Sequence, residues 1–418
     1  MSIAIIGAGA AGTMAAIFAA RSGVRTLVLE RTREGCKKIL ISGGGRCNVL
    51  PSRLDESRFV TDSSPNTLKR IVRSWPLREQ IAFFEHELHL PLVEEPESAK
   101  LFPASQRARD VRDALLNTAR DAGAELLTDT LVTGLAPTAR GWRIELNDAP
   151  PLDVDAVIVA TGGLSVPNTG SDGMGLRMLN MLGHTMRPTY AALTPVLASG
   201  SPFSTLAGVS FPITLQAKAP RREARATGGF LFTHHGYSGP AALDVSHVVV
   251  RARAEGPTEA RLHACWTTLN ESDWTARLSP QGQGTRPVLA VLRVELPERL
   301  ALVLLDLARV DASRTLAELR RDERLRLIDV LVRCPLPWTS DEGYKKAEVT
   351  GGGVDLSEID PRTMESRRHP RLFLCGEVLD AFGPIGGYNF LWAWATGRAA
   401  GLGAAASCAA MHSTSAHS

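Results

Sequence analysis

The sequence lacks the cysteine spacings that mark zinc sites and disulfide frameworks. Its six cysteines include no C-x-x-C pair, the arrangement in which cysteine-bound zinc is commonly held. We therefore expect no metal site and reduced thiols, which are the ordinary state of cysteine in the cytoplasm.

Net charge and long apolar runs are also scarce. The formal net charge is +3 over 418 residues, too small by itself to indicate binding to nucleic acid or to a membrane surface. Residues 1–23 are apolar, but they lack the basic start of a secretion signal and carry glycines at a fixed spacing that a signal does not need. No other uncharged run is long enough to span a bilayer. We expect a cytoplasmic protein with no membrane partner.

What the sequence does have is glycine in specific places. The motif GAGAAG begins at Gly7, directly after a short apolar run (residues 3–6) expected as a strand, and it opens an expected helix. In a G-x-G-x-x-G turn the first glycine allows the tight turn, Gly9 lets a pyrophosphate approach the backbone, and Gly12 lets the helix pack against the strand. With a second expected strand at 26–30, the pattern predicts a βαβ unit that binds a dinucleotide at the helix N-terminus.

Glu30 closes the second expected strand, eighteen positions after Gly12. A carboxylate at that place accepts hydrogen bonds from an adenosine ribose and repels a ribose 2′-phosphate, so NADP is disfavoured at this site. The alternative is a close-packed turn between helix and strand that holds no ligand.

The later glycine-rich segments bear on which dinucleotide is bound. Expected strands at 157–160 and 372–375 end in small residues, which can bring backbone groups to an extended cofactor far from its pyrophosphate. In GPIGGYNF, before the last expected helix, Gly386 and Gly387 would place backbone N–H groups and a positive helix end beside a ring that gains negative charge on reduction. This pattern favours FAD over NAD.

The composition changes in the middle of the chain. We expect residues 217–229, rich in Pro, Arg and Gly, to form a loop, and residues 312–333 to form a helix. Arginines in both segments fit either a solvated surface or an RNA-binding face. They are Arg221, Arg222 and Arg225 in the first segment, and those of residues 314–326 in the second.

Five longer blocks are ERTREGCKKILISGGGRCN, ATGGLSVPNTGS, GFLFTHHGYSGPAALDVS, EVTGGGVDLSEIDPRTMESR and FLCGEVLDAFGPIGGYNFLWAWATG. Together they resemble the BaiN/RdsA family of NAD(P)/FAD-dependent oxidoreductases, in the family's order and over nearly the whole chain. The resemblance implies an α/β fold, with a Rossmann-like, glutathione-reductase-like FAD domain built from both chain ends (1–190 and 345–418). It also implies an inserted domain (191–344) that is β-rich and then helical at about 287–335.

The resemblance also implies which residues hold FAD. In the family the GGGRCN loop lies against the cofactor, its glycines admit the cofactor, and its arginine brings positive charge near the pyrophosphate or flavin. Lys38 would pair with phosphate or with a carboxylate, or else lie solvated on the surface. Where the family usually has Gly-Asp-Gly, Met174 takes the middle place and Asp172 comes earlier. The expected cofactor-binding residues are Gly7, Gly9, Ala10, Ala11, Gly12, Glu30, Arg31, Lys38, Gly43, Gly44, Gly45, Arg46, Cys47, Asn48, Val132, Ala160, Thr161, Gly162, Gly163, Gly376, Glu377, Gly386, Gly387, Tyr388 and Asn389.

Three residues are candidates for the chemistry itself. His234 and His235, in FTHHGYSGP, would move protons during hydride transfer, or else serve as hydrogen-bonded turn residues. Cys47 would act as a redox thiol beside the flavin, or else as a packing cysteine, which its lack of a C-x-x-C partner favours.

We expect an FAD-dependent oxidoreductase that transfers a hydride through flavin N5 to reduce an unsaturated C=C substrate. The sequence holds no second G-x-G-x-x-G, so NAD(P)H would be a transient donor without a domain of its own. The resemblance implies that the substrate is a small molecule or a base in RNA. Two alternatives stay open: an oxygen-using oxidase of small amines, and a non-catalytic flavoprotein that binds RNA or senses redox state.

Overall fold

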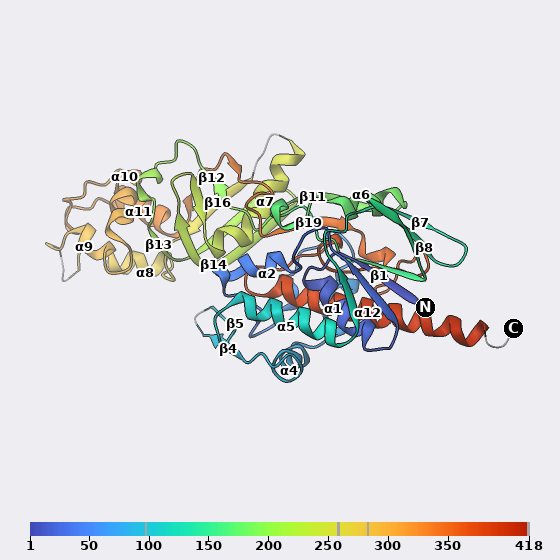
Figure 1. Cartoon of the computed structure of the whole chain (residues 1–418). Helices are drawn as coiled ribbons and strands as arrows, with labels where there is room; N and C mark the ends of the chain where they lie inside the picture. The colour runs from blue at the N-terminus through green and yellow to red at the C-terminus, as the bar shows by residue number, and fades with distance from the viewer. Residues whose placement is uncertain (97, 257–259, 282–283, 416–418) are drawn as a thin grey trace. The chain divides into compact units, whose positions relative to one another are not determined.

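The computed structural model describes residues 1–96, 98–256, 260–281 and 284–415. The chain divides into two compact units: unit 1, Met1–Tyr190 with Glu348–Ser418, and unit 2, Ala191–Ala347. Each unit has its own cluster of buried apolar side chains. Unit 1 is therefore assembled from both ends of the chain (Figure 1).

A five-stranded parallel sheet forms the centre of unit 1. Its strand order is β20-β10-β1-β2-β6, and all four neighbouring pairs are parallel. Most of its residues are buried, as expected for strands covered on both faces. The expected α/β fold with a Rossmann-like sheet from both chain ends is confirmed. The strands are β1 (Ser2–Ile6), β2 (Arg25–Leu29), β6 (Ala124–Leu127), β10 (Ala156–Val159) and β20 (Leu372–Leu374).

The first and last helices, α1 (Ala10–Ala20) and α12 (Tyr388–Ser415), lie side by side in unit 1 (Figure 1). Small residues make this possible, because a methyl group on Gly397 would lie 2.4 Å from the carbonyl oxygen of Ala11. Helix α5 (Ala108–Asp121) also packs against α1. The N-terminus of α1 is thus held from several directions at the end of β1.

Smaller elements surround the central sheet of unit 1. They include three further sheets, β3-β5-β4, β7-β8-β9 and β11-β19, and strand β11 continues for its last two residues into unit 2. The remaining elements of this unit are α2 (Lys37–Ile41), η1 (Ser42–Gly45), β3 (Leu50–Pro51), η2 (Glu56–Arg58), α3 (Pro65–Arg73), α4 (Leu77–Ala82), η3 (Phe83–Glu87), β4 (Leu92–Glu95), β5 (Lys100–Pro103), β7 (Val132–Pro137), β8 (Trp142–Leu146), β9 (Ala149–Val154), η4 (Pro167–Thr169), α6 (Met174–Met181), β11 (Met186–Ala192), β19 (Val349–Val354), η6 (Leu356–Glu358) and η7 (Gly376–Val378).

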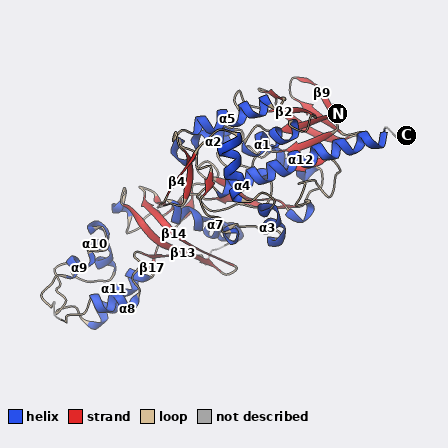
Figure 2. Cartoon of the chain, turned by 90° about the horizontal axis from the view of Figure 1, so that it is seen from below, coloured by secondary structure: helices blue, strands red, loops and turns tan. Residues whose placement is uncertain are grey.

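Unit 2 is built on a seven-stranded sheet of order β17-β16-β13-β14-β15-β12-β18. Its paired strands are antiparallel, α7 packs on β13 and β14, and a group of short helices follows (Figure 2). The elements are β12 (Val196–Leu197), η5 (Ser204–Leu206), β13 (Ser210–Ala219), β14 (Arg222–Phe232), β15 (Gly236–Ser238), α7 (Pro240–Glu255), β16 (Arg261–Cys265), α8 (Glu271–Arg277), α9 (Val288–Leu292), α10 (Glu298–Leu307), α11 (Arg321–Val332), β17 (Cys334–Pro335) and β18 (Ser340–Asp341).

Two expectations for unit 2 are wrong. Residues 217–229 form most of the β13–β14 hairpin and not a loop, because alanines such as Ala217 and Ala226 alternate with charged residues and face the core. The helix expected at 312–333 begins only at Arg321. Before it, Asp311 accepts hydrogen bonds from the backbone and hydroxyl of Ser313 at 2.8 and 2.6 Å, and such side-chain bonds compete with helix formation.

Candidate functional site

The turn after β1 has the tight geometry that its glycines predict. Gly7 has φ +100°, and a methyl group there would lie 2.7 Å from the carbonyl oxygen of Ala160. A methyl group on Gly12 would lie 1.9 Å from the carbonyl oxygen of Gly7. Gly9 differs, because no atom lies within 4 Å of the position that a methyl group would take. The turn is therefore closed around Gly7 and Gly12 and open in front of Gly9.

The N-terminus of α1 opens at the same place. Gly9 is the N-cap residue, with no side-chain capping bond, and the first turn of the helix contains no acidic side chain. The N–H groups of Ala10 and Ala11 belong to this turn, where α-helical donors have no partner within the helix. A phosphate fits such a site, because the N–H groups and the helix dipole both favour negative charge.

Glu30, directly after β2, is buried beside this turn. Its Oε2 accepts a hydrogen bond of 2.8 Å from the backbone N–H of Ala8. Its Oε1 accepts bonds from the backbone N–H and hydroxyl of Thr32 at 2.9 and 2.7 Å. A carboxylate offers roughly four acceptor positions, so one is left that suits a ribose hydroxyl. Glu30 thus fits the predicted ribose contact while it also shapes the turn.

Arg31 has a partner within the protein. Its guanidinium forms an ion pair with Asp172, and the same carboxylate accepts a bond of 3.0 Å from the backbone N–H of Met174. Burial acts to raise the pKa of Asp172, but Arg31 and this N–H outweigh it and hold the pKa below its ordinary value. The pair joins the end of β2 to the loop before α6, where Asp172 takes an ion-pairing role.

The backbone conformation of the GGGRCN loop explains why the loop contains three glycines. Gly43, Gly44 and Gly45 have φ values of +56°, +67° and +85°, in the left-handed region that residues with a side chain rarely adopt. All three are exposed, and no atom lies within 4 Å of a methyl position on Gly44. The loop therefore presents bare backbone to its surroundings, as a cofactor-contacting loop must.

Arg46 follows η1, and its side chain packs against the β3-β5-β4 sheet. Its guanidinium is 3.1 Å from Glu95, 3.4 Å from the side-chain oxygen of Gln106 and 4.2 Å from the ring centre of Phe102. Its charge is thus matched within unit 1, and its approach to a pyrophosphate or flavin stays a prediction.

Cys47 and Asn48 end the loop inside the core. Burial raises the pKa of the Cys47 thiol to about 12, although a bond with Ser42 acts to lower it. A neutral buried thiol suits packing better than redox chemistry. With its amide oriented to suit both neighbours, Asn48 donates to the carbonyl of Leu50 at 3.2 Å and accepts from the N–H of Gly387 at 3.1 Å. This bond brings the GGGRCN and GPIGGYNF segments together.

The GPIGGYNF segment is held by its own side chains. Asn389 accepts from the N–H of Gly383 and donates to its carbonyl, both at 2.9 Å. Gly387 has φ +88°, and a methyl group there would lie 2.4 Å from the carbonyl carbon of Leu50. Tyr388, the first residue of α12, is buried and accepts a bond of 3.2 Å from the N–H of Asp55. Asn389 and Tyr388 therefore position the loop.

Lys38 contacts a carboxylate, one of the two partners the sequence allowed. Its Nζ lies 2.8 Å from Glu377 Oε2 and donates to Ser165 Oγ at 2.6 Å. The backbone N–H of Thr350 donates to Glu377 Oε1 at 2.9 Å. Ser165 and Thr350 were not among the residues predicted from the sequence, although both lie in the glycine-rich blocks. Ser165 and Thr350 come from the two separate parts of unit 1, and both donate hydrogen bonds to Glu377.

The strand-end loops carry further expected residues. Gly162 and Gly376 have φ values of +73° and +76°, and a methyl group on Gly175 would lie 1.9 Å from Thr161 Oγ1. Val132, the first residue of β7, is buried, as a packing side chain would be.

The two candidate histidines lie in unit 2, in the turn between β14 and β15. Both are exposed. The N–H of His235 donates to Thr233 Oγ1 at 3.2 Å, and its carbonyl accepts from the N–H of Ala198 at 2.8 Å. These backbone contacts suit the turn role, and proton transfer by His234 or His235 stays a prediction.

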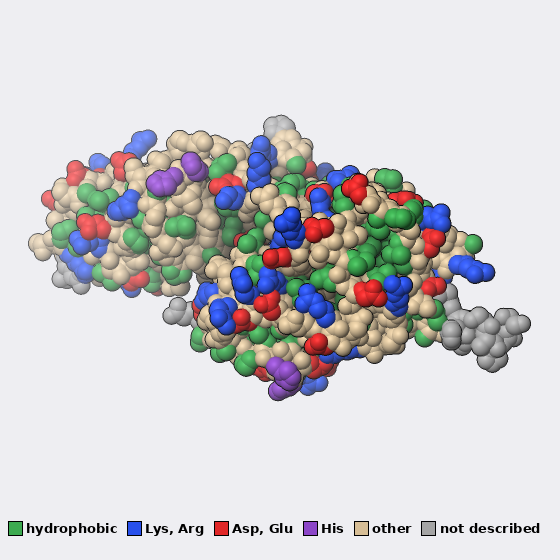
Figure 3. All heavy atoms as spheres, viewed as in Figure 1, with side chains coloured by type: hydrophobic (Ala, Val, Ile, Leu, Met, Phe, Trp, Pro, Cys, Tyr) green, Lys and Arg blue, Asp and Glu red, His purple; other side chains and the backbone are tan. Residues whose placement is uncertain are grey.

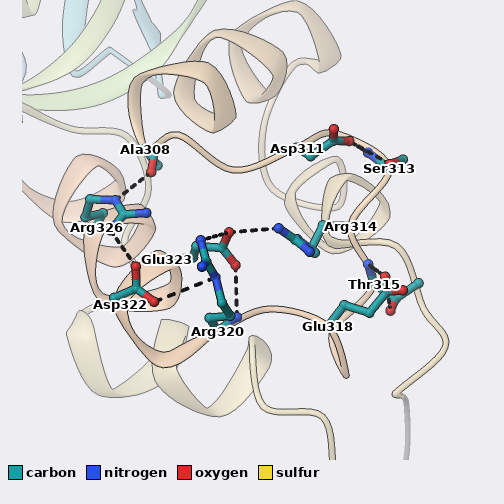
Figure 4. A network of polar contacts seen from close by, with 10 residues as sticks. All are labelled: Ala308, Asp311, Ser313, Arg314, Thr315, Glu318, Arg320, Asp322, Glu323 and Arg326. Carbon is teal, nitrogen blue, oxygen red and sulfur yellow. Dashed lines mark hydrogen bonds and ion pairs between the residues drawn. The ribbon is translucent and has the colours of Figure 1, made fainter.

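The arginine-rich segment before and within α11 is paired internally (Figure 4). Glu323 accepts bonds of 2.9 Å from both Arg314 and Arg320. Arg326 pairs with Asp322 at 2.8 Å and donates to the carbonyl of Ala308 at 2.9 Å. In the face shown in Figure 3, basic and acidic side chains are interspersed. These arginines therefore suit a solvated amphipathic surface better than an RNA-binding face.

Comparison with known proteins assigns the chain to a family. The model described as "HI0933-like protein Rossmann domain" matches residues 1–403. The chain belongs to the HI0933-like family. This HI0933-like protein is 31% identical over 409 residues to the 3-dehydro-bile acid delta(4,6)-reductase of Clostridium scindens. The alignment covers 96% of this chain and 98% of that relative. It is 32% identical over 412 residues to the ribosomal RNA dihydrouridine synthase of Escherichia coli, and this alignment covers 94% of this chain and 95% of that relative.

A solved structure agrees in fold. The 3-ketosteroid delta1-dehydrogenase of Sterolibacterium denitrificans superposes with a TM-score of 0.53 at 11% identity, covering 97% of this chain and 99% of that one. Within the described residues, no helix is long and apolar enough to cross a membrane, and no three His, Cys, Asp or Glu side chains are grouped to hold a metal ion.

The HI0933-like protein is an FAD-dependent oxidoreductase, and unit 1 has residues that fit FAD. The open space at Gly9 and the uncapped N-terminus of α1 suit the pyrophosphate, and Glu30 suits the ribose. When bound, FAD supplies hydride chemistry at its ring. The backbone of 43–45, 160–163 and 386–387 would line the rest of the cofactor.

Proposed function

We propose that this protein reduces a carbon–carbon double bond, with NAD(P)H as a transient electron donor. The observation that carries the proposal is the likeness, over more than nine-tenths of the chain, to two relatives named for different substrates. One is a delta(4,6)-reductase, and the other makes dihydrouridine, which is uridine with a saturated ring double bond. The relatives share a reaction type and not a substrate, so the reaction type is the better supported part.

The proposed donor binds transiently because the sequence has a single G-x-G-x-x-G. Glu30 and the turn at Gly7 are assigned to FAD, which leaves no second fingerprint of this kind for a nicotinamide cofactor. NAD(P)H would therefore bind, reduce the flavin and leave.

We propose a small molecule as the substrate, with its double bond conjugated to a carbonyl group. Conjugation makes the distant alkene carbon electron-poor, which a hydride acceptor requires. The internal pairing of Arg314, Arg320 and Arg326 supports a small molecule over RNA, because phosphate binding needs cations that are free to contact the backbone.

The test is anaerobic. The FAD-loaded protein is mixed with NADH or NADPH, and loss of the visible flavin absorption reports reduction. A conjugated steroid enone or a ribosomal RNA transcript is then added, and mass spectrometry detects the gain of two hydrogens. Reoxidation by the enone with saturation of its double bond is the expected result. Saturation of uridine alone would make RNA the substrate. Hydrogen peroxide release from small amines in air, without alkene reduction, would contradict the proposal.

A further inference from the structure

The Lys38–Glu377 ion pair lies beyond the carboxyl end of strand β20 of the central sheet. Lys38 stands in α2, and Glu377 follows β20 in η7. The ammonium and carboxylate are 2.8 Å apart. Ser165 Oγ accepts from Lys38 at 2.6 Å and donates to Glu377 Oε1 at 2.7 Å. One hydroxyl therefore fixes both charges in a single arrangement.

The pair is largely withdrawn from water. The side chains of Lys38 and Glu377 are 27% and 17% exposed. Burial acts to raise the pKa of Glu377, but Lys38, Ser165 and Thr350 outweigh it, so the pKa is lower than for a free carboxyl group. Glu377 is thus ionised at neutral pH. Fixed charges that solvent does not screen act over longer distances than surface charges.

The position of the pair is the second observation. Ser165 lies in the loop after β10, and Glu377 lies after the neighbouring parallel strand β20. Ligands of open α/β sheets bind beyond the carboxyl ends of the strands. A methyl group on Gly163 would lie 2.8 Å from Glu377 Oε1 and 2.4 Å from Thr350 Oγ1. The carboxylate therefore lies directly behind the backbone of residues 160–163, assigned above to FAD.

We propose that the balanced charges of Lys38 and Glu377 set the reduction potential of the bound flavin. Reduction adds negative charge to the flavin ring, so a nearby positive charge favours it and a nearby negative charge opposes it. In the intact pair the two effects offset each other. The proposal uses FAD binding by unit 1 and is independent of the double-bond substrate proposed above.

Stability alone does not account for such a pair. Desolvation of two charges offsets much of their attraction, and buried ion pairs are often no more stabilising than apolar residues of similar size. A role in tuning charge near the cofactor gives the pair a function that an apolar replacement would lose.

The experiment measures the midpoint potential of bound FAD at about pH 8, well above the ordinary pKa of a carboxyl group. Lys38→Met leaves the carboxylate unpaired, and we expect at least a tenfold decrease in the equilibrium constant for two-electron reduction, which corresponds to about 30 mV. Glu377→Gln leaves the ammonium without this carboxylate partner and should shift the potential upward by a similar factor. Lys38→Arg keeps the charge and should stay near the unmodified value.

A surface pair in the same unit is the matched control. Arg143 and Asp153 are 2.9 Å apart, with side chains 50% and 60% exposed, and Arg143→Met should leave the potential unchanged. Opposite shifts in the Lys38→Met and Glu377→Gln variants support the proposal. Shifts in the same direction, or shifts below threefold in both, overturn it. If Lys38→Met does not fold, the isosteric Glu377→Gln decides alone, and an unchanged potential there overturns the proposal.

These outcomes are distinguishable from failure of the proposed function. The potential is measured on the bound flavin with a redox dye and without any alkene. A protein that shows the opposite shifts but reduces no double bond would keep the inference and lose the substrate proposal.

Discussion

The backbone N–H of Ala8 donates a hydrogen bond of 2.8 Å to Glu30 Oε2, so the residue that ends β2 is tied to the turn that follows β1. The bond is buried and joins positions 22 residues apart. Glu30 therefore has a structural role besides the ribose contact that is predicted for it. It satisfies a backbone donor inside the turn that is predicted to bind the pyrophosphate, and it sets the shape of that turn.

Glu30→Ala is expected to weaken both the fold and cofactor binding. The Ala8 N–H loses its acceptor in a buried place, which costs about 1–3 kcal/mol in the free energy of unfolding. The affinity for FAD should fall at least tenfold, or about 1.4 kcal/mol. Urea unfolding of the FAD-free protein and a fluorescence titration with FAD measure the two effects. Glu34, which pairs with Arg112 and is 61% exposed, supplies the control Glu34→Ala, for which both values should stay nearly unchanged.

Gly9→Ala and Gly12→Ala should separate binding from folding. Gly9 has φ −78°, which alanine adopts without strain, and no atom lies near the added methyl group. We expect unchanged stability of the FAD-free protein but at least tenfold weaker FAD binding, because the methyl group fills the space assigned to the pyrophosphate. At Gly12 the methyl group would lie 1.9 Å from the Gly7 carbonyl oxygen, so stability itself should fall by about 1–3 kcal/mol. Equal FAD affinity in Gly9→Ala and the parent would contradict the assignment.

Cys47 is expected to be inert in the native protein. All six cysteines are free thiols, and of these only Cys265 is partly exposed, while Cys47 and the rest are buried. Burial raises the pKa of Cys47 to about 12, and thiolate is the reactive form. A thiol reagent such as DTNB should react quickly with one group that Cys265→Ser removes, and with the others only on unfolding. If a fast-reacting thiol remained in Cys265→Ser and was absent from Cys47→Ser, the redox role of Cys47 would again be supported.

Short-range patterns made the nucleotide turn predictable. Gly7, Gly12 and Glu30 lie within one βαβ unit, where strand, turn and helix spacing fix their relative places. The pairing of Lys38 with Glu377 joins positions 339 residues apart. The family resemblance implied that both residues lie near the cofactor, but the sequence could not distinguish a phosphate partner of Lys38 from a carboxylate partner. Only the tertiary fold of unit 1, which is assembled from both ends of the chain, brings the two segments together.

The β13–β14 hairpin shows a different limit. Its Pro, Arg and Gly content resembled that of a loop, and this composition concealed the alternation of small and charged residues that marks a strand. Ala217 pairs with Ala224 across the two strands. Alanine gives a weak apolar signal, so the alternation is visible only when the partner strand is known.

Unit 1 is expected to lose stability in acid through Glu358. Burial acts to raise the pKa of Glu358, but bonds from Arg368, Thr185 and His184 outweigh it and lower the pKa from 4.5 to about 2. The folded protein therefore binds this proton less readily than the unfolded chain, so the stabilisation is complete above about pH 4.5 and is lost as the pH falls toward 2. The lost amount is about 3 kcal/mol, from 1.36 kcal/mol for each unit of pKa.

His184 also makes the folded protein less stable as the pH falls, but it does so at higher pH than Glu358. Burial lowers its pKa below 6.5, although Glu358, 2.8 Å from Nδ1, acts to raise it. The folded protein favours the neutral ring, so this contribution is lost as the pH falls below 6.5. Unfolding free energies measured from about pH 7 to 3, with hydrogen exchange to assign the transition of unit 1, should decrease throughout this range. Glu358→Gln should make the unfolding free energy less dependent on pH below about pH 4.5. Glu125 is the control, because it pairs with Arg25 at the surface and its side chain is 53% exposed, so Glu125→Gln should leave the pH dependence unchanged. A curve unchanged by Glu358→Gln would show that other carboxyl groups control acid unfolding.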